Sequence, residues 1–159
     1  MFMKPVKLQD IVDEMDMQMD ESRVLLNKGT GEIIYVNIED LSLAEDSEED
    51  DDFSEYPDWH QESLKEALDV IINWENYEEL PDKFEINEYH IMEEFSGSIP
   101  DEKISSSLYS AIQGRGAFRR FKDTITRLGV EEDWYKFREK AFRNIAIKWF
   151  EYNEIEYID

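Results

Sequence analysis

The chain has 159 residues, of which 41% are hydrophobic and 13% aromatic, and its formal net charge is −23; these values exclude a wholly disordered chain and favour a folded domain with a core. It has no cysteine, which excludes disulfides, thiolate catalysis and thiolate-bound zinc. No apolar run approaches the roughly 20 residues that span a bilayer, and the N-terminus lacks the features of a secretory signal, so we expect a soluble cytoplasmic protein without a membrane partner.

The first predicted elements are a helix and a β-hairpin. Apolar residues at helical spacing predict a helix over about residues 7–16. Two β-rich runs, 23–27 and 32–37, flank the sequence KGTG, whose glycines can supply the positive φ of a tight loop. Because two strands alone are only marginally stable, the hairpin must pack on helices or gain a third strand. The C-terminal sequence EIEYID is the candidate for that strand.

Residues 39–58 contain eleven acidic residues and no basic one. The run is polar, repulsive and aperiodic, which favours a mobile acidic linker. A calcium loop is a weaker alternative, because residues 45–56 lack the glycine at position six and the glutamate at position twelve of an EF-hand loop. Contact with a basic segment of the same chain is a further alternative.

The remainder of the chain has helical periodicity. The predicted helices cover about residues 58–74, 86–97, 100–113, 117–128 and 131–152, and the stripe of the first includes Trp59. We therefore predict an α+β, mostly α fold, in which an N-terminal β-hairpin packs on a bundle of about five helices. The predicted organisation is a single domain over residues 1–159. It comprises a helix and hairpin (1–38), an acidic linker (39–58) and a helical body (59–159).

Positive charge gathers in residues 114–125, GRGAFRRFKDTI, whereas residues 1–100 carry the entire net charge of −23 and residues 101–159 are neutral. The second glycine precedes a predicted helix, whose free N–H groups and dipole favour an anion. Cations in the first turn oppose that dipole, so their placement calls for a compensating anion. The candidate anion-binding residues are Arg115, Gly116, Arg119, Arg120 and Lys122, and the candidate stacking residues are Phe118 and Phe121.

Two kinds of anion fit this segment. One is external: a phosphate, a nucleic-acid backbone or an acidic protein surface. The other is internal, such as the carboxylates of Glu93 and Glu94, and pairing within the chain is the preferred interpretation. Arginine binds carboxylate and phosphate alike, so residue type does not decide. The net charge opposes nucleic acid at long range, and the glycine spacing is not a dinucleotide fingerprint.

The other candidate groups favour structural roles. His60 and His90 are each interpreted as ordinary surface histidines, although His90 and Glu94 have the i,i+4 spacing that can hold a metal. No second His–acid pair accompanies them. The sequence DWYKFREKAFR, residues 133–143, alternates aromatic and basic residues as a single-strand stacking platform would, but its spacing favours a core. No catalytic nucleophile motif is present.

Over nearly its full length the chain resembles uncharacterised protein family 0158, a family of short acidic bacterial proteins. The similarity is carried by KLQDIVDEMDMQMDE, LNKGTGEI, YPDW and IAIKWFEYNEIEY, and above all by GRGAFRRFKDTITRLGVEEDWYKFRE. The resemblance implies a bacterial origin and a cytoplasmic location. It implies no activity, no cofactor and no catalytic residue.

Three hypotheses follow from the sequence. The first is a non-catalytic binding or regulatory module with an anion-binding basic segment at residues 115–122. The second is an acidic interaction protein that occupies a basic partner through residues 39–58. The third, which we favour least, is an enzyme with an acidic site, with or without a metal, near His90 and Glu94. We expect no cofactor, and the sequence predicts no oligomeric state.

Overall fold

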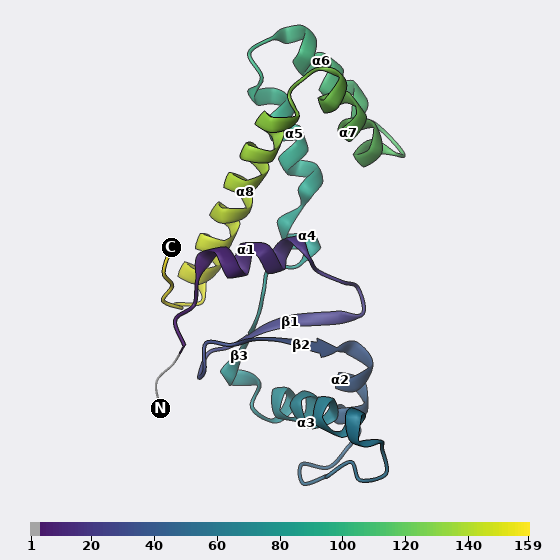
Figure 1. Cartoon of the computed structure of the whole chain (residues 1–159), viewed down its shortest axis with the longest axis vertical. Helices are drawn as coiled ribbons and strands as arrows, with labels where there is room; N and C mark the ends of the chain where they lie inside the picture. Colours follow the sequence, from purple (N-terminus) through teal and green to yellow (C-terminus); the bar gives the residue numbers. More distant parts are fainter. Residues whose placement is uncertain (1–3) are drawn as a thin grey trace. The chain divides into compact units, whose positions relative to one another are not determined.

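The computed structural model describes residues 4–159, and the chain divides into two compact units (Figure 1). Unit 1 comprises Met1–Asp82 and Ala146–Asp159, and unit 2 is Lys83–Ile145. The fold is α+β and mostly α, which confirms the predicted class. Residues 59–82 belong to the same unit as the hairpin, and unit 2 is an insertion within unit 1.

A three-stranded antiparallel sheet lies at the centre of unit 1. Strands β1 (Ser22–Asn27) and β2 (Ile33–Asn37) form the predicted hairpin. The third strand is β3 (Tyr77–Glu79), which pairs with the other edge of β1 and gives the order β2-β1-β3. The C-terminal segment is therefore not the third strand. It forms one parallel bridge outside the sheet, between Lys7 and Ile158.

Two helices cover one face of this sheet (Figure 1). Helix α2 (Ile38–Glu45) follows β2 directly and is capped by Asn37, whose side chain accepts a hydrogen bond from the Glu39 N–H at 2.8 Å. Helix α3 (Asp58–Ile72) ends before a short 3-10 turn, Trp74–Asn76. The buried cluster between sheet and helices consists of Leu25, Val36, Ala44, Phe53, Leu64, Ala67 and Leu68.

The structure differs from the mobile linker that the sequence predicts over residues 39–58. The first part of this run is helix α2. Farther along, Phe53 is only 2% exposed, although it is flanked by acidic residues. Its N–H donates to Asp51 at 2.8 Å, and the Ser54 N–H donates to Asp52 at 3.0 Å. The acidic loop is residues 46–57, between α2 and α3. Burial of one phenylalanine contributes about 1.5–3 kcal/mol, which offsets the backbone entropy of only about two of these residues.

The opposite face of the sheet is covered by α1 (Leu8–Asp16) (Figure 1). This helix confirms the one predicted over residues 7–16. Helix α8 (Glu131–Tyr152) begins in unit 2 and ends in unit 1, where the Trp149 indole N–H donates to the Glu79 carbonyl at 2.9 Å. Backbone hydrogen bonds then join the C-terminal segment to the N-terminal one. The Ile158 N–H donates to the Val6 carbonyl at 2.9 Å, and the Leu8 N–H donates to the Ile158 carbonyl at 2.8 Å.

Unit 2 is helical throughout. Besides the first part of α8 it contains α4 (Lys83–Ile86), α5 (Glu88–Ser98), α6 (Glu102–Ala111) and α7 (Ala117–Arg127). Its core is aromatic: the Trp134 ring centroid lies 5.4 Å from that of Phe95 and 4.8 Å from that of Phe121, both edge to face. Trp134, in the candidate stacking sequence 133–143, is therefore a core residue. Within residues 4–159, no helix is long and apolar enough to cross a membrane.

Candidate functional site

The sequence GRG forms the turn between α6 and α7. Gly114 and Gly116 both have positive φ, 74° and 75°, a conformation that residues with a Cβ adopt only with strain. Gly116 is the N-cap of α7 and has no side chain to cap the first N–H groups of the helix. The glycine spacing therefore shapes a short turn and leaves the start of α7 uncapped.

Arg120 is hydrogen-bonded inside this turn. Its Nε–H donates to the Ala111 carbonyl at 2.9 Å, and its two terminal nitrogens donate to the carbonyls of Gln113 and Arg115. Ala111 is the last residue of α6, where the helix dipole is negative, and Gln113 and Arg115 lie in the turn that follows. The cation in the first turn of α7 is thus compensated by backbone carbonyls at the end of the preceding helix. Arg120 fixes the turn.

Phe121 is buried, whereas Phe118 is accessible. Phe121 is 1% exposed and packs edge to face against Trp134, so it has no free ring face for a ligand. Phe118 is 51% exposed on α7. Of the two candidate stacking residues, the structure leaves only Phe118 accessible to a partner molecule.

Three exposed cations lie near Phe118, two on α7 and one in the turn before it. Lys122 is four residues after Phe118 and three after Arg119, spacings that make side chains neighbours on a helix surface. Arg115 lies in the turn that precedes α7. All three are exposed, and within residues 4–159 none of their side chains has a hydrogen-bond or ion-pair partner. We call Arg115, Phe118, Arg119 and Lys122 the basic face.

Several other cations contact carboxylates. Arg23 lies 3.0 Å from Glu79, and the Arg138 Nε lies 2.6 Å from Glu88. These pairs neutralise positive charge locally, whereas the basic face has no such partner in the described part of the chain and extends its potential into solvent. Asp123 is also exposed on α7 and is the nearest acidic residue along the helix. The predicted pairing with Glu93 or Glu94 does not occur.

The two histidines lie in different surroundings. His90 is exposed, and its Nε2 lies 2.7 Å from Glu94, in keeping with a surface histidine. The His60 side chain is only 20% exposed and its Nε2 lies 2.8 Å from Asp40, so it links α3 to α2. Trp59 stacks on the His60 ring and is itself 77% exposed, which corrects its predicted place in the core stripe. Within residues 4–159 no group of three or more His, Asp or Glu side chains has a metal-binding arrangement.

These features define a mostly α, α+β protein with a strongly acidic unit and an unpartnered basic face on a second unit. The chain belongs to uncharacterised protein family UPF0158, whose model matches residues 3–159, and the predicted resemblance is confirmed. It is similar to UPF0158 protein PA5073 of Pseudomonas aeruginosa, with 27% identity over 67 residues. The match covers 42% of this chain and 44% of that protein, so less than half of the relative is spanned. No solved structure matches the chain.

Proposed function

We propose that the protein is a non-catalytic binding module whose basic face takes a compact anionic ligand or an acidic protein segment. The observation that carries this proposal is the group of three exposed cations, each without a partner in the described residues, around a half-exposed phenylalanine. In a chain with 40 acidic residues, carboxylates are abundant. Cations that remain free in such a chain are available to a partner molecule.

The chemistry of the basic face suits carboxylate and phosphate groups. Arg115 and Arg119 each offer a planar fork of donors that can hold two oxygens at once, and Lys122 adds a point charge. Phe118 offers an apolar surface beside them. The uncapped N–H groups at the start of α7 add hydrogen-bond donors that also carry partial positive charge. The turn fixed by Arg120 holds the Arg115 backbone in place, which reduces the entropy lost on binding.

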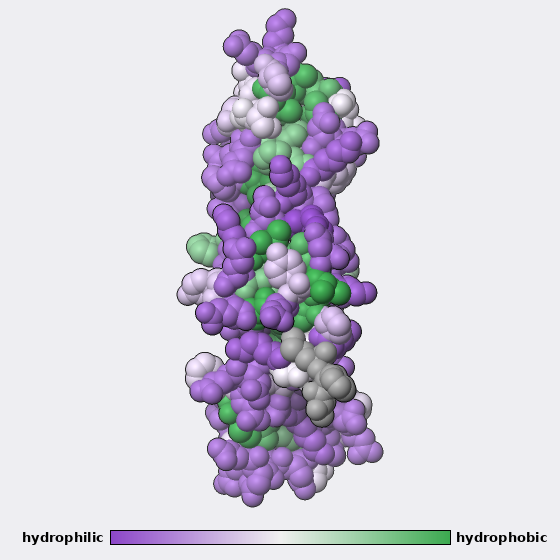
Figure 2. All heavy atoms as spheres, turned by 90° about the vertical axis from the view of Figure 1, so that its left-hand side faces the viewer, coloured by the Kyte–Doolittle hydropathy of each residue, from purple (hydrophilic) through white to green (hydrophobic). Residues whose placement is uncertain are grey.

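The charge distribution favours a compact anion over a long one. Unit 1 contains 29 acidic and six basic residues and so carries the whole net charge of −23, whereas unit 2 contains eleven of each. The surface in Figure 2 is mostly hydrophilic, in keeping with the 36% of charged residues. A long nucleic acid would meet the repulsion of unit 1, but a phosphate group or a short acidic segment engages the basic face alone.

The test is a titration of the isotope-labelled full chain with pyrophosphate and with a hexaglutamate peptide, followed by the NMR shifts of backbone amides. We expect saturable shifts at residues 115–122 that weaken as salt is added. Arg119→Gln should reduce the affinity. The control Arg127→Gln removes the same charge from the same helix outside the basic face, and it should leave the affinity near the parent value. Equal losses in both variants, or no shifts at low salt, would refute the proposal.

A second candidate function is the acidic interaction protein. The acidic loop supports it, because burial of Phe53 in the core of unit 1 holds the loop in place. Glu48, Glu49 and Asp50 of this loop are exposed to solvent. We expect a tetralysine peptide to bind there. Neutralising these three residues as Gln, Gln and Asn should weaken that binding without unfolding the loop. Unchanged binding would remove this candidate.

A further inference from the structure

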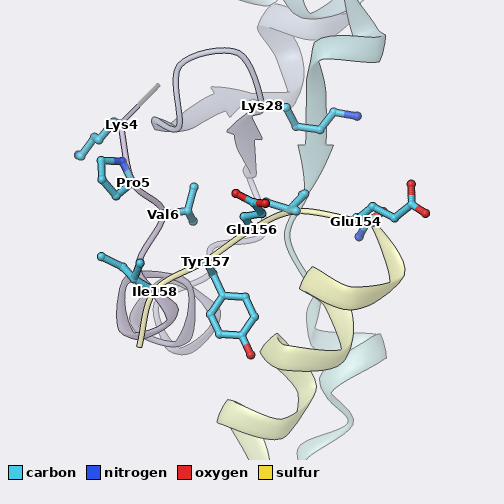
Figure 3. A pocket seen from close by; sticks show the side chains of 10 residues that line it. Lys4, Pro5, Val6, Lys28, Glu154, Glu156, Tyr157 and Ile158 are labelled. Carbon is cyan, nitrogen blue, oxygen red and sulfur yellow. The ribbon is translucent and has the colours of Figure 1, made fainter. Parts of the chain in front are cut away.

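A hollow of about 490 Å³ lies in unit 1, apart from the basic face (Figure 3). Its walls come from three segments: Lys4–Val6, the hairpin loop at Lys28, and residues 153–158. Backbone hydrogen bonds hold these segments together, because the Lys4 N–H donates to the Thr30 carbonyl at 2.8 Å and the C-terminal segment bonds to the Val6 carbonyl. The volume falls within the range of about 300–1,000 Å³ found for small-molecule sites.

One carboxylate points into this hollow. Figure 3 shows the Glu156 side chain directed toward Val6, on the opposite wall. Glu156 has no hydrogen-bond or ion-pair partner within residues 4–159. Lys28, also on the wall, lies 3.7 Å from Glu78, which already offsets its charge. Lys4 stands on the rim and points away from Glu156 in Figure 3.

The rest of the wall includes an apolar part. Pro5, Ile155 and Ile158 contribute hydrocarbon surface, and Glu154 adds a second carboxylate. A carboxylate beside an apolar wall matches a molecule with one positive head and a short hydrocarbon stem. Burial of the stem supplies affinity, and the charged head supplies orientation.

The negative charge of the surrounding unit favours a positively charged ligand. Unit 1 carries the entire net charge of −23, so cations are drawn toward it and anions are repelled. This preference is opposite to that of the basic face. The two sites therefore take ligands of opposite charge and are tested independently.

We propose that this hollow binds a primary ammonium group on a short apolar stem, with Glu156 as its counter-ion. Such a group occurs in free alkylamines and in lysine side chains. The ammonium donates to the Glu156 carboxylate, and the stem lies against Pro5, Ile155 and Ile158. This inference does not rest on the proposed anion binding.

The experiment compares three six-carbon probes on the isotope-labelled full chain: hexylamine, hexanol and hexanoate. Hexylamine should shift the backbone amides of Val6, Glu156 and Ile158 saturably, hexanol should bind more weakly, and hexanoate should not bind. Glu156→Gln should lower the affinity for hexylamine about fivefold or more, as expected for the loss of a charge-assisted hydrogen bond. The control Glu151→Gln removes an exposed charge from α8 outside the hollow and should leave the affinity unchanged.

The outcomes separate the sources of the ammonium and can overturn the proposal. A blocked lysine derivative that binds more tightly than hexylamine identifies a protein lysine as the occupant, and the reverse identifies a free amine. Equal binding of hexanoate and hexylamine overturns the proposal. So does an unchanged affinity in Glu156→Gln, or the lack of any shift at these three amides.

Discussion

Two helix ends show how one backbone geometry is made by different residues. In α7 the Val130 N–H donates to the Ile125 carbonyl at 3.0 Å, and in α8 the Ile155 N–H donates to the Phe150 carbonyl at 2.9 Å. In both, the residue before the donor is left-handed: Gly129 has φ 71°, and Glu154 has φ 55°. Glycine adopts this conformation freely, but a side chain there costs about 1–2 kcal/mol.

Glu154→Gly should therefore stabilise unit 1. Removing the left-handed strain stabilises the folded state by more than the extra conformational entropy of glycine stabilises the unfolded state. The free energy of unfolding should therefore rise by about 0.5–1 kcal/mol. Urea denaturation measures the change. The matched control Glu151→Gly lies inside α8 and should lower stability by about 1 kcal/mol. A loss of stability in Glu154→Gly would show that its side chain makes a stabilising contribution larger than the strain.

Arg120 and Arg119 are neighbours with different roles. Arg120→Ala removes the donors to three backbone carbonyls in the last residue of α6 and the turn after it, and it should lower the free energy of unfolding by about 1–2 kcal/mol. Arg119→Ala removes an exposed side chain and should stay within about 0.5 kcal/mol of the parent. Thermal denaturation of both variants tests this difference. Similar stabilities would mean that the Arg120 contacts do not hold the turn.

At the scale of elements, two tyrosines link the sheet to the helices on its two faces. The Tyr35 hydroxyl of β2 donates to Glu14 of α1, and the Tyr77 hydroxyl of β3 donates to Asp69 of α3. The pKa of Tyr35 is raised to about 12, mainly by burial and secondly by the neighbouring Glu14 carboxylate. The same two causes, with Asp69 as the carboxylate, raise the pKa of Tyr77. Both hydroxyls favour the neutral form in the folded chain.

The fold should therefore lose stability at alkaline pH. Because the folded pKa of Tyr35 exceeds its unfolded value near 10, its contribution is complete below about pH 10 and is lost as pH rises through about 12. Urea midpoints measured across this range should fall. The double variant Tyr35→Phe, Tyr77→Phe should flatten that fall, whereas the control Tyr135→Phe, on exposed Tyr135 in unit 2, should not. An unaltered slope in the double variant would contradict the role of the two hydroxyls.

The sequence predicts long periodic elements better than short or non-local ones. Helix α8 shows its full length in its apolar stripe, and α6 and α7 are bounded by glycines. Strand β3 has three residues, too few for an alternating pattern, and its partner β1 lies some fifty residues earlier. Helix α2 lies in an acidic run and depends on burial of Ala44, which single-sequence periodicity does not reveal.

The candidate site was predictable by residue type but not by role. The charge pattern indicates all the arginines of residues 115–120, but it does not distinguish Arg120 from the others. Arg120 contacts backbone carbonyls, whose positions depend on the geometry of the turn. Phe118 and Phe121 are likewise three residues apart, and only packing shows that one is exposed and the other buried. The hollow near Glu156 joins segments from both ends of the chain and has no sequence motif.

At the scale of the whole molecule, the uneven charge should make stability depend on salt in one unit. Repulsion within unit 1, with its net −23, destabilises the compact state, whereas unit 2 is neutral overall. Raising ionic strength from 0.01 M to 0.1 M shortens the screening length from about 30 Å to about 10 Å. This increase in salt should therefore slow the hydrogen exchange of backbone amides around Trp149 in unit 1. It should change the exchange rates around Trp134 in unit 2 little. Equal effects in both units would contradict this prediction.

The insertion of unit 2 within unit 1 also sets an order for folding during synthesis. The ribosome releases residues 83–145 before residues 146–159, so unit 2 has all its residues while unit 1 still lacks its last ones. Trp149 and Ile158, whose hydrogen bonds reach Glu79 and Val6, emerge after all of unit 2. A chain arrested before residue 146 would hold its acidic unit incomplete, with α1 missing the C-terminal segment that it bonds in the finished protein.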